Sequence, residues 1–108
     1  MAVKDILETE IPKRLTEKPE IGKDINAVVH FNITGDGGGA WTLDCTKSEG
    51  WVTSGTNGES KMTITATAAD FEKIISKQLS AQTAAMTGKL KFKPMDMGLA
   101  MKLAKLMG

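Results

Sequence analysis

Hydrophobic residues recur along this chain with two different periods, one typical of helices and the other typical of strands. The first segment, up to Pro19, has helical spacing, and Pro12 interrupts it, so we expect a kink or two short helices. From Ala27 to Thr34 apolar and polar residues alternate, which predicts a strand. The glycine-rich segment 35–39 predicts a turn into a second alternating stretch. The chain therefore begins with helical structure followed by a hairpin.

The second half of the chain repeats this change of period. Short strands are predicted at 51–53 and 62–67, separated by a polar loop. Helical spacing then returns, with Thr67 and Asp70 as possible caps, and a second short helix follows. A fifth strand at 89–93 precedes a final helix that we expect to begin at Pro94. The order of one helical segment, four strands, two helices, one strand and one helix predicts an α+β domain.

Length and composition restrict the possible functions. The 108 residues correspond to one domain, 1–108, with 41% hydrophobic and 25% charged residues, which is typical of a folded domain. Fourteen basic and 13 acidic residues give a net charge of +1, which argues against nucleic-acid binding. A single cysteine excludes an internal disulfide, and the single cysteine and histidine together exclude multi-ligand metal sites of those residue types.

Catalytic and targeting motifs are scarce. The glycine turn lacks the following Gly-Lys-Ser/Thr of a phosphate-binding loop, and no nucleophile elbow accompanies His30, which we expect at the surface. Cys45 is expected to be a small buried hydrophobic residue. No signal-type or membrane-spanning apolar run occurs, and the chain does not end in the peroxisomal Ser-Lys-Leu. We therefore expect a cytoplasmic protein that is not an enzyme and has no cofactor or metal.

The last helix has a wider apolar arc than an ordinary surface helix, roughly 200° against about 100°. Lys102 and Lys105 occupy the remainder, and Leu106 borders it. The arc predicts a helix buried between neighbours, a dimer contact, or one wall of a lipid pocket. The adaptable methionine side chain favours the lipid pocket. Because residues 89–108 contain five lysines and one aspartate, transient membrane contact is a further possibility. The arc consists of Met97, Leu99, Ala100, Met101, Leu103, Ala104 and Met107.

The C-terminal part of the chain resembles the signature of the sterol carrier protein (non-specific lipid-transfer) domain. The resemblance lies in 88–92, Gly-Lys-Leu-Lys-Phe, and 97–103, Met-Gly-Leu-Ala-Met-Lys-Leu, and extends over roughly residues 26–108. Segments 31–35, 39–44 and 63–71 also fall where that family has similar residues. The chain departs from the family at Lys93-Pro94-Met95-Asp96, where Thr-Gly-Asn is expected before the final helix.

This resemblance implies a five-stranded mixed sheet of order 3-2-1-4-5, covered on one face by helices. It also implies an apolar tunnel between sheet and helices, partly closed by the C-terminal helix. Asn57-Gly58 by itself favours a tight hairpin between strands three and four, whereas the family topology implies that this connection crosses the sheet. The implied ligands are fatty acids, fatty acyl-CoA esters, sterols or phospholipids, bound without catalysis.

A set of apolar residues on the inward strand positions and the helices is expected to line the lipid site, although each would equally serve as core. An empty cavity of ~300 Å³ would cost about 7 kcal/mol, so we expect the protein to purify with bound lipid. Lys93, Lys102 and Lys105 could contact a head group or membrane, or could be solvated surface lysines. The expected lipid-binding residues are Phe31, Ile33, Trp41, Ile64, Phe71, Ile75, Leu79, Met86, Leu90, Phe92, Met97, Ala100, Met101 and Ala104.

An alternative function is an interaction or dimerisation module that uses the apolar C-terminal helix and serves an enzyme handling acyl-CoA. In that case removal of 94–108 would abolish assembly more than lipid affinity. Either function is compatible with a monomer or a weak dimer.

Overall fold

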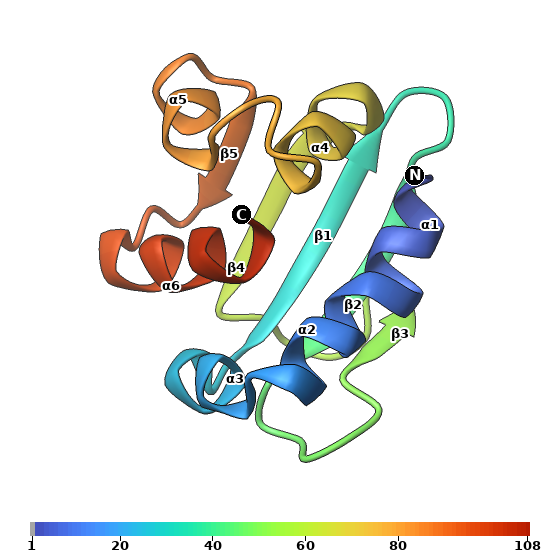
Figure 1. The fold of residues 1–108 in the computed structure, drawn as a ribbon, viewed down its shortest axis with the longest axis vertical. Helices are drawn as coiled ribbons and strands as arrows, with labels where there is room; N and C mark the ends of the chain where they lie inside the picture. Colours follow the sequence, from blue (N-terminus) through green and yellow to red (C-terminus); the bar gives the residue numbers. More distant parts are fainter. Residues whose placement is uncertain (1) are drawn as a thin grey trace.

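Five strands form one mixed sheet in the structure, a computed structural model that describes residues 2–108 (Figure 1). The strand order β3-β2-β1-β4-β5 confirms the expected topology. β1 and β4 are parallel, and the other neighbouring pairs are antiparallel. The strands are β1 (Val28–Thr34), β2 (Gly39–Asp44), β3 (Val52–Ser54), β4 (Met62–Thr67) and β5 (Leu90–Lys93).

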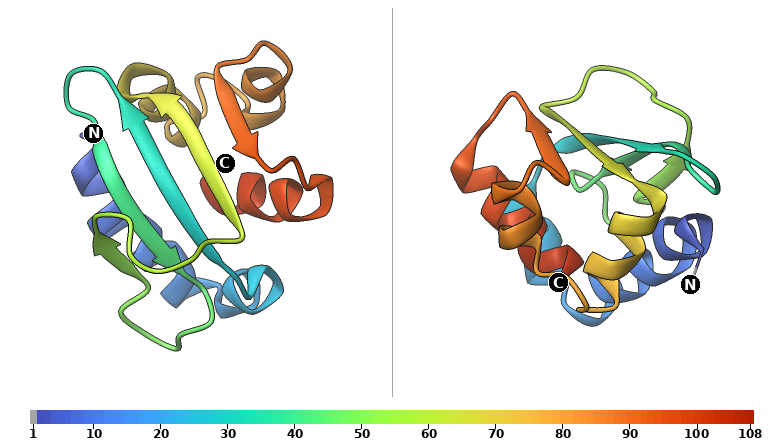
Figure 2. Two further views of the ribbon diagram at one scale, coloured as in Figure 1. Left: turned by 180° about the vertical axis from the view of Figure 1, so that it is seen from behind. Right: turned by 90° about the horizontal axis from the view of Figure 1, so that it is seen from above.

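The helices gather on one side of the sheet, as expected (Figure 2). None of the helices within residues 2–108 has the length and hydropathy that a membrane span requires. In chain order they are α1 (Val3–Asp5), the π-helical turn η1 (Ile6–Glu10), α2 (Ile11–Glu17), α3 (Pro19–Ile25), α4 (Ala68–Ile75), α5 (Ala81–Met86) and α6 (Met97–Met107).

The N-terminal helical segment is continuous through α1, η1 and α2. Pro12 lies in the first turn of α2, directly after the π turn. A proline ring inside a helix clashes with the carbonyl four residues earlier, and a wider π turn relieves that clash. We expected a kink or two short helices at Pro12, whereas the structure has one continuous helical path with a π turn directly before α2.

The core lies between the sheet and the helices. Val29, Phe31 and Ile33 of β1 are buried, whereas the alternate positions of this strand are exposed or half-buried. The ring of Phe31 meets that of Phe71 in α4 edge-on, with centroids 5.8 Å apart. Thr67 caps α4 by accepting a hydrogen bond from Asp70 N at 3.2 Å, which confirms that part of the capping prediction.

The turn between β1 and β2 requires glycine. A Cβ atom on Gly38 would lie 2.2 Å from the carbonyl oxygen of Ile33, and Gly35 and Gly37 have positive φ angles of 83° and 80°. The two strands pair in antiparallel register on either side of this turn. The segment is therefore the predicted hairpin turn.

The connection between β3 and β4 crosses the outer face of the sheet (Figure 2). Thr42 Oγ1 donates to Gly55 O at 2.7 Å and accepts from Asn57 N at 2.8 Å. The carbonyl oxygen of Asn57 also lies 3.2 Å from His30 Nε2. These contacts hold the loop over β2 and β1, so Asn57-Gly58 forms part of a crossing connection and not a tight hairpin.

The last helix differs from the sequence prediction in where it begins and in which side it buries. It begins at Met97 and not at Pro94, because the carboxylate of Asp96 caps it by accepting from Leu99 N at 3.2 Å. Leu106, expected at the polar border, is 1% exposed. Met97 and Met101, expected within the apolar arc, are 64% and 66% exposed. Packing has therefore buried the side of α6 that carries Leu106 and left part of the apolar arc in solvent.

Candidate functional site

An apolar groove with a volume of about 510 Å³ lies between α5, β5 and α6. Gln82 supplies the one polar side chain of its lining, and no charged side chain lines it. Several of its residues are methionines, so we call it the methionine groove. Its lining is Ala81, Gln82, Ala85, Met86, Phe92, Met95, Met97, Ala100, Met101 and Ala104.

Local sequence rules place the groove residues. Ser80 caps α5 by accepting from Thr83 N at 3.0 Å, and Gly88, with φ of 77°, turns the chain into β5. In β5 the two-residue period buries Leu90 and brings Phe92, two positions later, to the groove. Met97 and Met101 are four residues apart and so lie on the same face of α6.

The methionine side chains in the groove are unusually exposed. Met86, Met95, Met97 and Met101 are 80%, 61%, 64% and 66% exposed, and they are the exposed large hydrophobic residues of the described chain. All four line this one groove. Contiguous exposed apolar surface of this kind marks sites that bind ligands, proteins or membranes. Methionine suits variable ligands because its unbranched thioether adapts its shape.

The structure divides the predicted lipid-binding residues into two groups. One group lines the methionine groove: Met86, Phe92, Met97, Ala100, Met101 and Ala104. The other group packs in or against the core and does not line this groove: Phe31, Ile33, Trp41, Ile64, Phe71, Ile75, Leu79 and Leu90. Lipid contact by either group remains a prediction.

Trp41 lies far from the groove in the sheet. It belongs to β2, whereas the groove adjoins β5 at the opposite edge. Its indole Nε1 donates to Glu8 Oε2 at 2.9 Å, which ties β2 to the N-terminal helical segment. Sequence alternation predicts that Trp41 faces the helices, but it cannot predict which helix it meets.

Sequence reasoning missed four groove residues, Ala81, Gln82, Ala85 and Met95. Ala81 and Ala85 are one helical turn apart on α5, and this spacing was available in the sequence. Met95 lies outside any helix, in the segment wrongly assigned to the last helix. No periodic pattern could have selected it.

The structure does not show the expected tunnel between sheet and helices. The methionine groove is open to solvent and lies beside β5. The N-terminal helical segment contributes the fully buried side chains of Ile6, Leu7, Ile11 and Leu15 to the core, together with Phe31 of β1.

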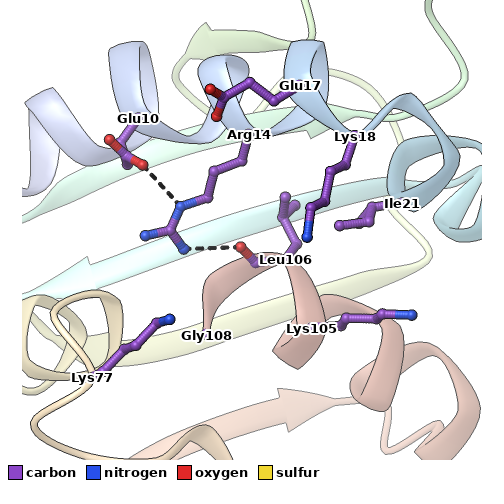
Figure 3. Close-up of a pocket in the computed structure, with 9 residues that line it drawn as sticks. All are labelled: Glu10, Arg14, Glu17, Lys18, Ile21, Lys77, Lys105, Leu106 and Gly108. Carbon is purple, nitrogen blue, oxygen red and sulfur yellow. Dashed lines mark hydrogen bonds and ion pairs between the residues drawn. The ribbon is translucent and has the colours of Figure 1, made fainter.

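A second, polar concavity of about 270 Å³ surrounds Arg14 (Figure 3). Arg14 Nε donates to Glu10 Oε2 at 2.9 Å, and Nη1 donates to the carbonyl oxygens of Leu106 at 3.0 Å and Met107 at 2.6 Å. A cation at these carbonyls also interacts favourably with the dipole of α6. The hydrogen bonds of Arg14 hold the end of α6 in place, so this concavity is part of the packing of α6.

The predicted head-group lysines are all exposed, and none lines the methionine groove. Lys102 Nζ donates to the carbonyl oxygen of Asp24 at 3.2 Å, and Lys105 lines the polar concavity around Arg14 (Figure 3). Lys93 follows Phe92 in β5, so the two residues lie on opposite faces of the sheet. Contact of these lysines with a head group or membrane remains a prediction.

Groups that could perform chemistry are dispersed within the described residues, where no three His, Cys, Asp or Glu side chains cluster as metal ligands would. Cys45 is buried, as predicted, and burial together with the negative charge of Asp44 raises the pKa of its thiol to about 12. Since the thiolate is the nucleophilic form, Cys45 is unreactive near neutral pH. His30 is half-buried under the β3–β4 loop and not fully at the surface.

The fold and the open apolar groove together define a small lipid-carrier type of domain. Residues 7–108 match the SCP-2 sterol transfer family, and the chain belongs to this family of lipid-binding and lipid-transfer domains. The hydroxysteroid dehydrogenase-like protein 2 of Danio rerio is 38% identical over 93 residues, and that of Homo sapiens 37% over 89. Each match covers 82% of this chain but 21% of the relative, so the chain spans about a fifth of their length.

Solved structures of sterol carrier proteins share the fold. The sterol carrier protein domain 2 of Helicoverpa armigera superposes with a TM-score of 0.81 at 25% identity, covering 97% of this chain and 84% of that one. Palmitated SCP2L2 from Aedes aegypti gives 0.79 at 28% identity, with 99% and 95% covered. Sterol carrier protein 2 from Yarrowia lipolytica gives 0.69 at 29% identity, with 96% and 82% covered.

Proposed function

We propose that the methionine groove holds the apolar part of a lipid, which this chain carries without changing it chemically. The observation that carries the proposal is the convergence of four exposed methionines on one groove. Exposure of these side chains forgoes the stabilisation that burial would give, and a bound alkyl chain or ring system would restore it. The lining offers no nucleophile and no titratable side chain, which supports a carrier and not an enzyme.

The groove fits ligands that are defined by their apolar portion. Its volume of about 510 Å³ falls within the ~300–1,000 Å³ usual for small-molecule sites. Burial of about eight methylene groups at ~0.8 kcal/mol each would contribute roughly 6 kcal/mol before the costs of binding. With no charge in the lining, the head group would extend into solvent. Fatty acids, fatty acyl-CoA esters, sterols and phospholipids all meet these requirements.

The last helix would then form one wall of an open groove. An open groove avoids the cost of an empty enclosed cavity, so the lipid can enter and leave without a large conformational change. The lysines of residues 89–105 give this end of the molecule a positive charge, which supports transient contact with an anionic membrane surface during loading.

A fluorescent fatty acid displaced by unlabelled palmitate tests the proposal. We expect saturable binding that weakens at least about tenfold in Met97→Gln/Met101→Gln, because glutamine has a similar shape but is polar. The matched control Met97→Leu/Met101→Leu keeps the groove apolar and should bind within about threefold of the unmodified chain. Equal affinities of the two double variants would exclude the groove as the lipid site.

A second candidate function is an interaction module, because the same exposed methionines could be covered by a second copy of the chain. Sedimentation over a range of protein concentrations distinguishes it. A dimer that is lost in Met97→Gln/Met101→Gln, while fatty-acid affinity is unchanged, would favour this alternative. A monomer at all concentrations would leave lipid binding as the function of the groove.

A further inference from the structure

The six methionines of residues 2–108 fall into two sharply different environments. Met62 and Met107 are 0% exposed and belong to the core. The remaining four are 61–80% exposed, and all of them line the methionine groove: Met86, Met95, Met97 and Met101. Solvent-borne reagents that attack thioether sulfur therefore meet the groove first.

We propose that these four methionines form a reversible oxidation site through which hydroperoxides weaken lipid binding by the groove. The site itself follows from exposure alone, whereas its effect on lipid binding rests on the proposed function. The proposal assigns to one surface both the uptake of an apolar ligand and the response to an oxidant.

The oxidation of a methionine in this groove needs only hydrogen peroxide as co-reactant. The thioether sulfur attacks one peroxide oxygen, an S–O bond forms, and the O–O bond breaks. Sulfur is oxidised by two electrons to the sulfoxide, and the second peroxide oxygen leaves as water after taking up the proton of the transferred hydroxyl. One peroxide is consumed per methionine. Methionine sulfoxide reductases A and B, one for each sulfoxide epimer, reverse the oxidation with two electrons and two protons from a dithiol, which becomes a disulfide, and the sulfoxide oxygen leaves as water.

The other sulfur nucleophile of the chain does not compete for the oxidant. Cys45, directly after β2, belongs to the core and is 5% exposed. Its raised pKa of about 12 keeps the thiol protonated near neutral pH, and the thiolate is the form that peroxide oxidises. Among the sulfur atoms of residues 2–108, those of the groove methionines are therefore the first to react.

Oxidation would change the groove without unfolding the chain. A sulfoxide is polar, and an alkyl chain cannot hydrogen-bond to its oxygen, so each sulfoxide facing the ligand disfavours binding. Helix α6 packs through Leu99, Leu103 and Leu106, which the oxidant leaves unchanged. The fold should therefore persist while the lining changes from apolar to polar.

Peptide mapping by mass spectrometry after graded hydrogen peroxide treatment tests the site. We expect sulfoxide at Met86, Met95, Met97 and Met101 well before Met62. Fluorescent fatty-acid affinity should fall at least about tenfold in the oxidised protein, with an unchanged far-UV circular dichroism spectrum. Treatment with the two reductases and an excess of a dithiol reductant should restore the affinity. The matched control replaces these four residues by leucine, which removes the sulfur from the groove and keeps it apolar. Its own fatty-acid affinity, whatever its value before treatment, should not change with peroxide.

The outcomes separate the two proposals. Oxidation of Met62 and Met107 as fast as the groove methionines would overturn the oxidation site, whatever the protein binds. Selective oxidation with unchanged fatty-acid affinity would overturn the regulatory effect. A chain that binds no fatty acid before treatment refutes the proposed function and with it this effect, while peptide mapping still decides the oxidation site. Peroxide sensitivity of the four-leucine variant would also count against the proposal, because its groove has no sulfur.

Discussion

The methionines of this chain occupy two different environments, the core and the solvent-exposed groove. In the core, Met62 is fully buried on β4, where it packs as any large aliphatic side chain would. In the groove, Met97 and Met101 lie open to solvent on α6. The side chain is the same, and only its surroundings determine whether it stabilises the fold or offers a binding surface.

Cys45 provides a prediction at this scale. Its pKa of about 12 in the folded chain lies above the ordinary value of 9.0, mainly because burial disfavours the thiolate and secondarily because of the negative charge of Asp44. Between these two pH values the unfolded chain binds fewer protons than the folded chain, so this contribution to stability is lost as the pH rises from about 9. Between pH 9 and 10 the free energy of unfolding of the unmodified chain should therefore fall by about 1 kcal/mol relative to that of Cys45→Ala.

Urea unfolding at pH 8, 9 and 10 measures this difference, and titration of groups common to both proteins cancels in the comparison. A constant difference across this range would show that the thiol is not perturbed. Iodoacetamide at pH 8 offers an independent check, because native Cys45 should alkylate far more slowly than the thiol of the urea-unfolded chain.

Helix α6 depends on a residue almost at the other end of the chain. Arg14 of α2 donates to the carbonyl oxygens of Leu106 and Met107, and Glu10 orients the guanidinium (Figure 3). These carbonyls lie in the last turn of the helix, where the helix itself supplies no donors. The wall of the groove is therefore fixed in place by an element that does not line the groove.

Replacement of Arg14 should loosen this wall. Arg14→Met keeps much of the alkyl packing but removes the hydrogen bonds, and we expect a loss of about 1–3 kcal/mol in the free energy of unfolding. Amide hydrogen exchange should become faster across α6 and change little in β1. The matched control Lys13→Met replaces an exposed neighbour and should stay within about 0.5 kcal/mol. Similar stabilities of the two variants would show that Arg14 does not hold the helix.

At the scale of the whole molecule, three elements form the groove. They are α5, β5 and α6, and they meet at the edge of the sheet that ends in β5. In Figure 1 the central strand β1 runs between the N-terminal helical segment on one side and α4 and α6 on the other, and its inward side chains are buried in the core. The exposed methionines of the proposed ligand site thus lie apart from the core, although Ala100 belongs to both the groove and the core.

This separation gives a thermodynamic prediction. A lipid that binds the folded chain but not the unfolded chain stabilises it by mass action, about 1.4 kcal/mol at a free concentration of ten times Kd. For a domain of this size we expect an increase in Tm of about 5–10 °C on addition of fatty acid. Differential scanning fluorimetry should show this increase in the unmodified chain and lose most of it in Met97→Gln/Met101→Gln. An equal increase in that variant would place the ligand elsewhere.

Much of the fold was predictable because it depends on local patterns. The alternation in β1, the glycine turn before β2 and the Thr67 cap of α4 each follow from neighbouring residues. The strand order came from the resemblance and not from the pattern, since Asn57-Gly58 by itself indicates a hairpin. The start of α6 was predicted wrongly because Pro94 and Asp96 are competing local signals, and the carboxylate of Asp96 supplies the cap.

The sequence by itself determined that this protein is an α+β domain of the sterol carrier type with an unusually apolar last helix. Only the tertiary structure decided which side of that helix is buried, that Asn57 lies across the outer face of the sheet, and that the groove is open beside β5. The physical reason is that hydropathy measures what a side chain would gain from burial. Whether it is buried depends on partners distant in sequence, which cover Leu106 of α6 but not Met97 and Met101.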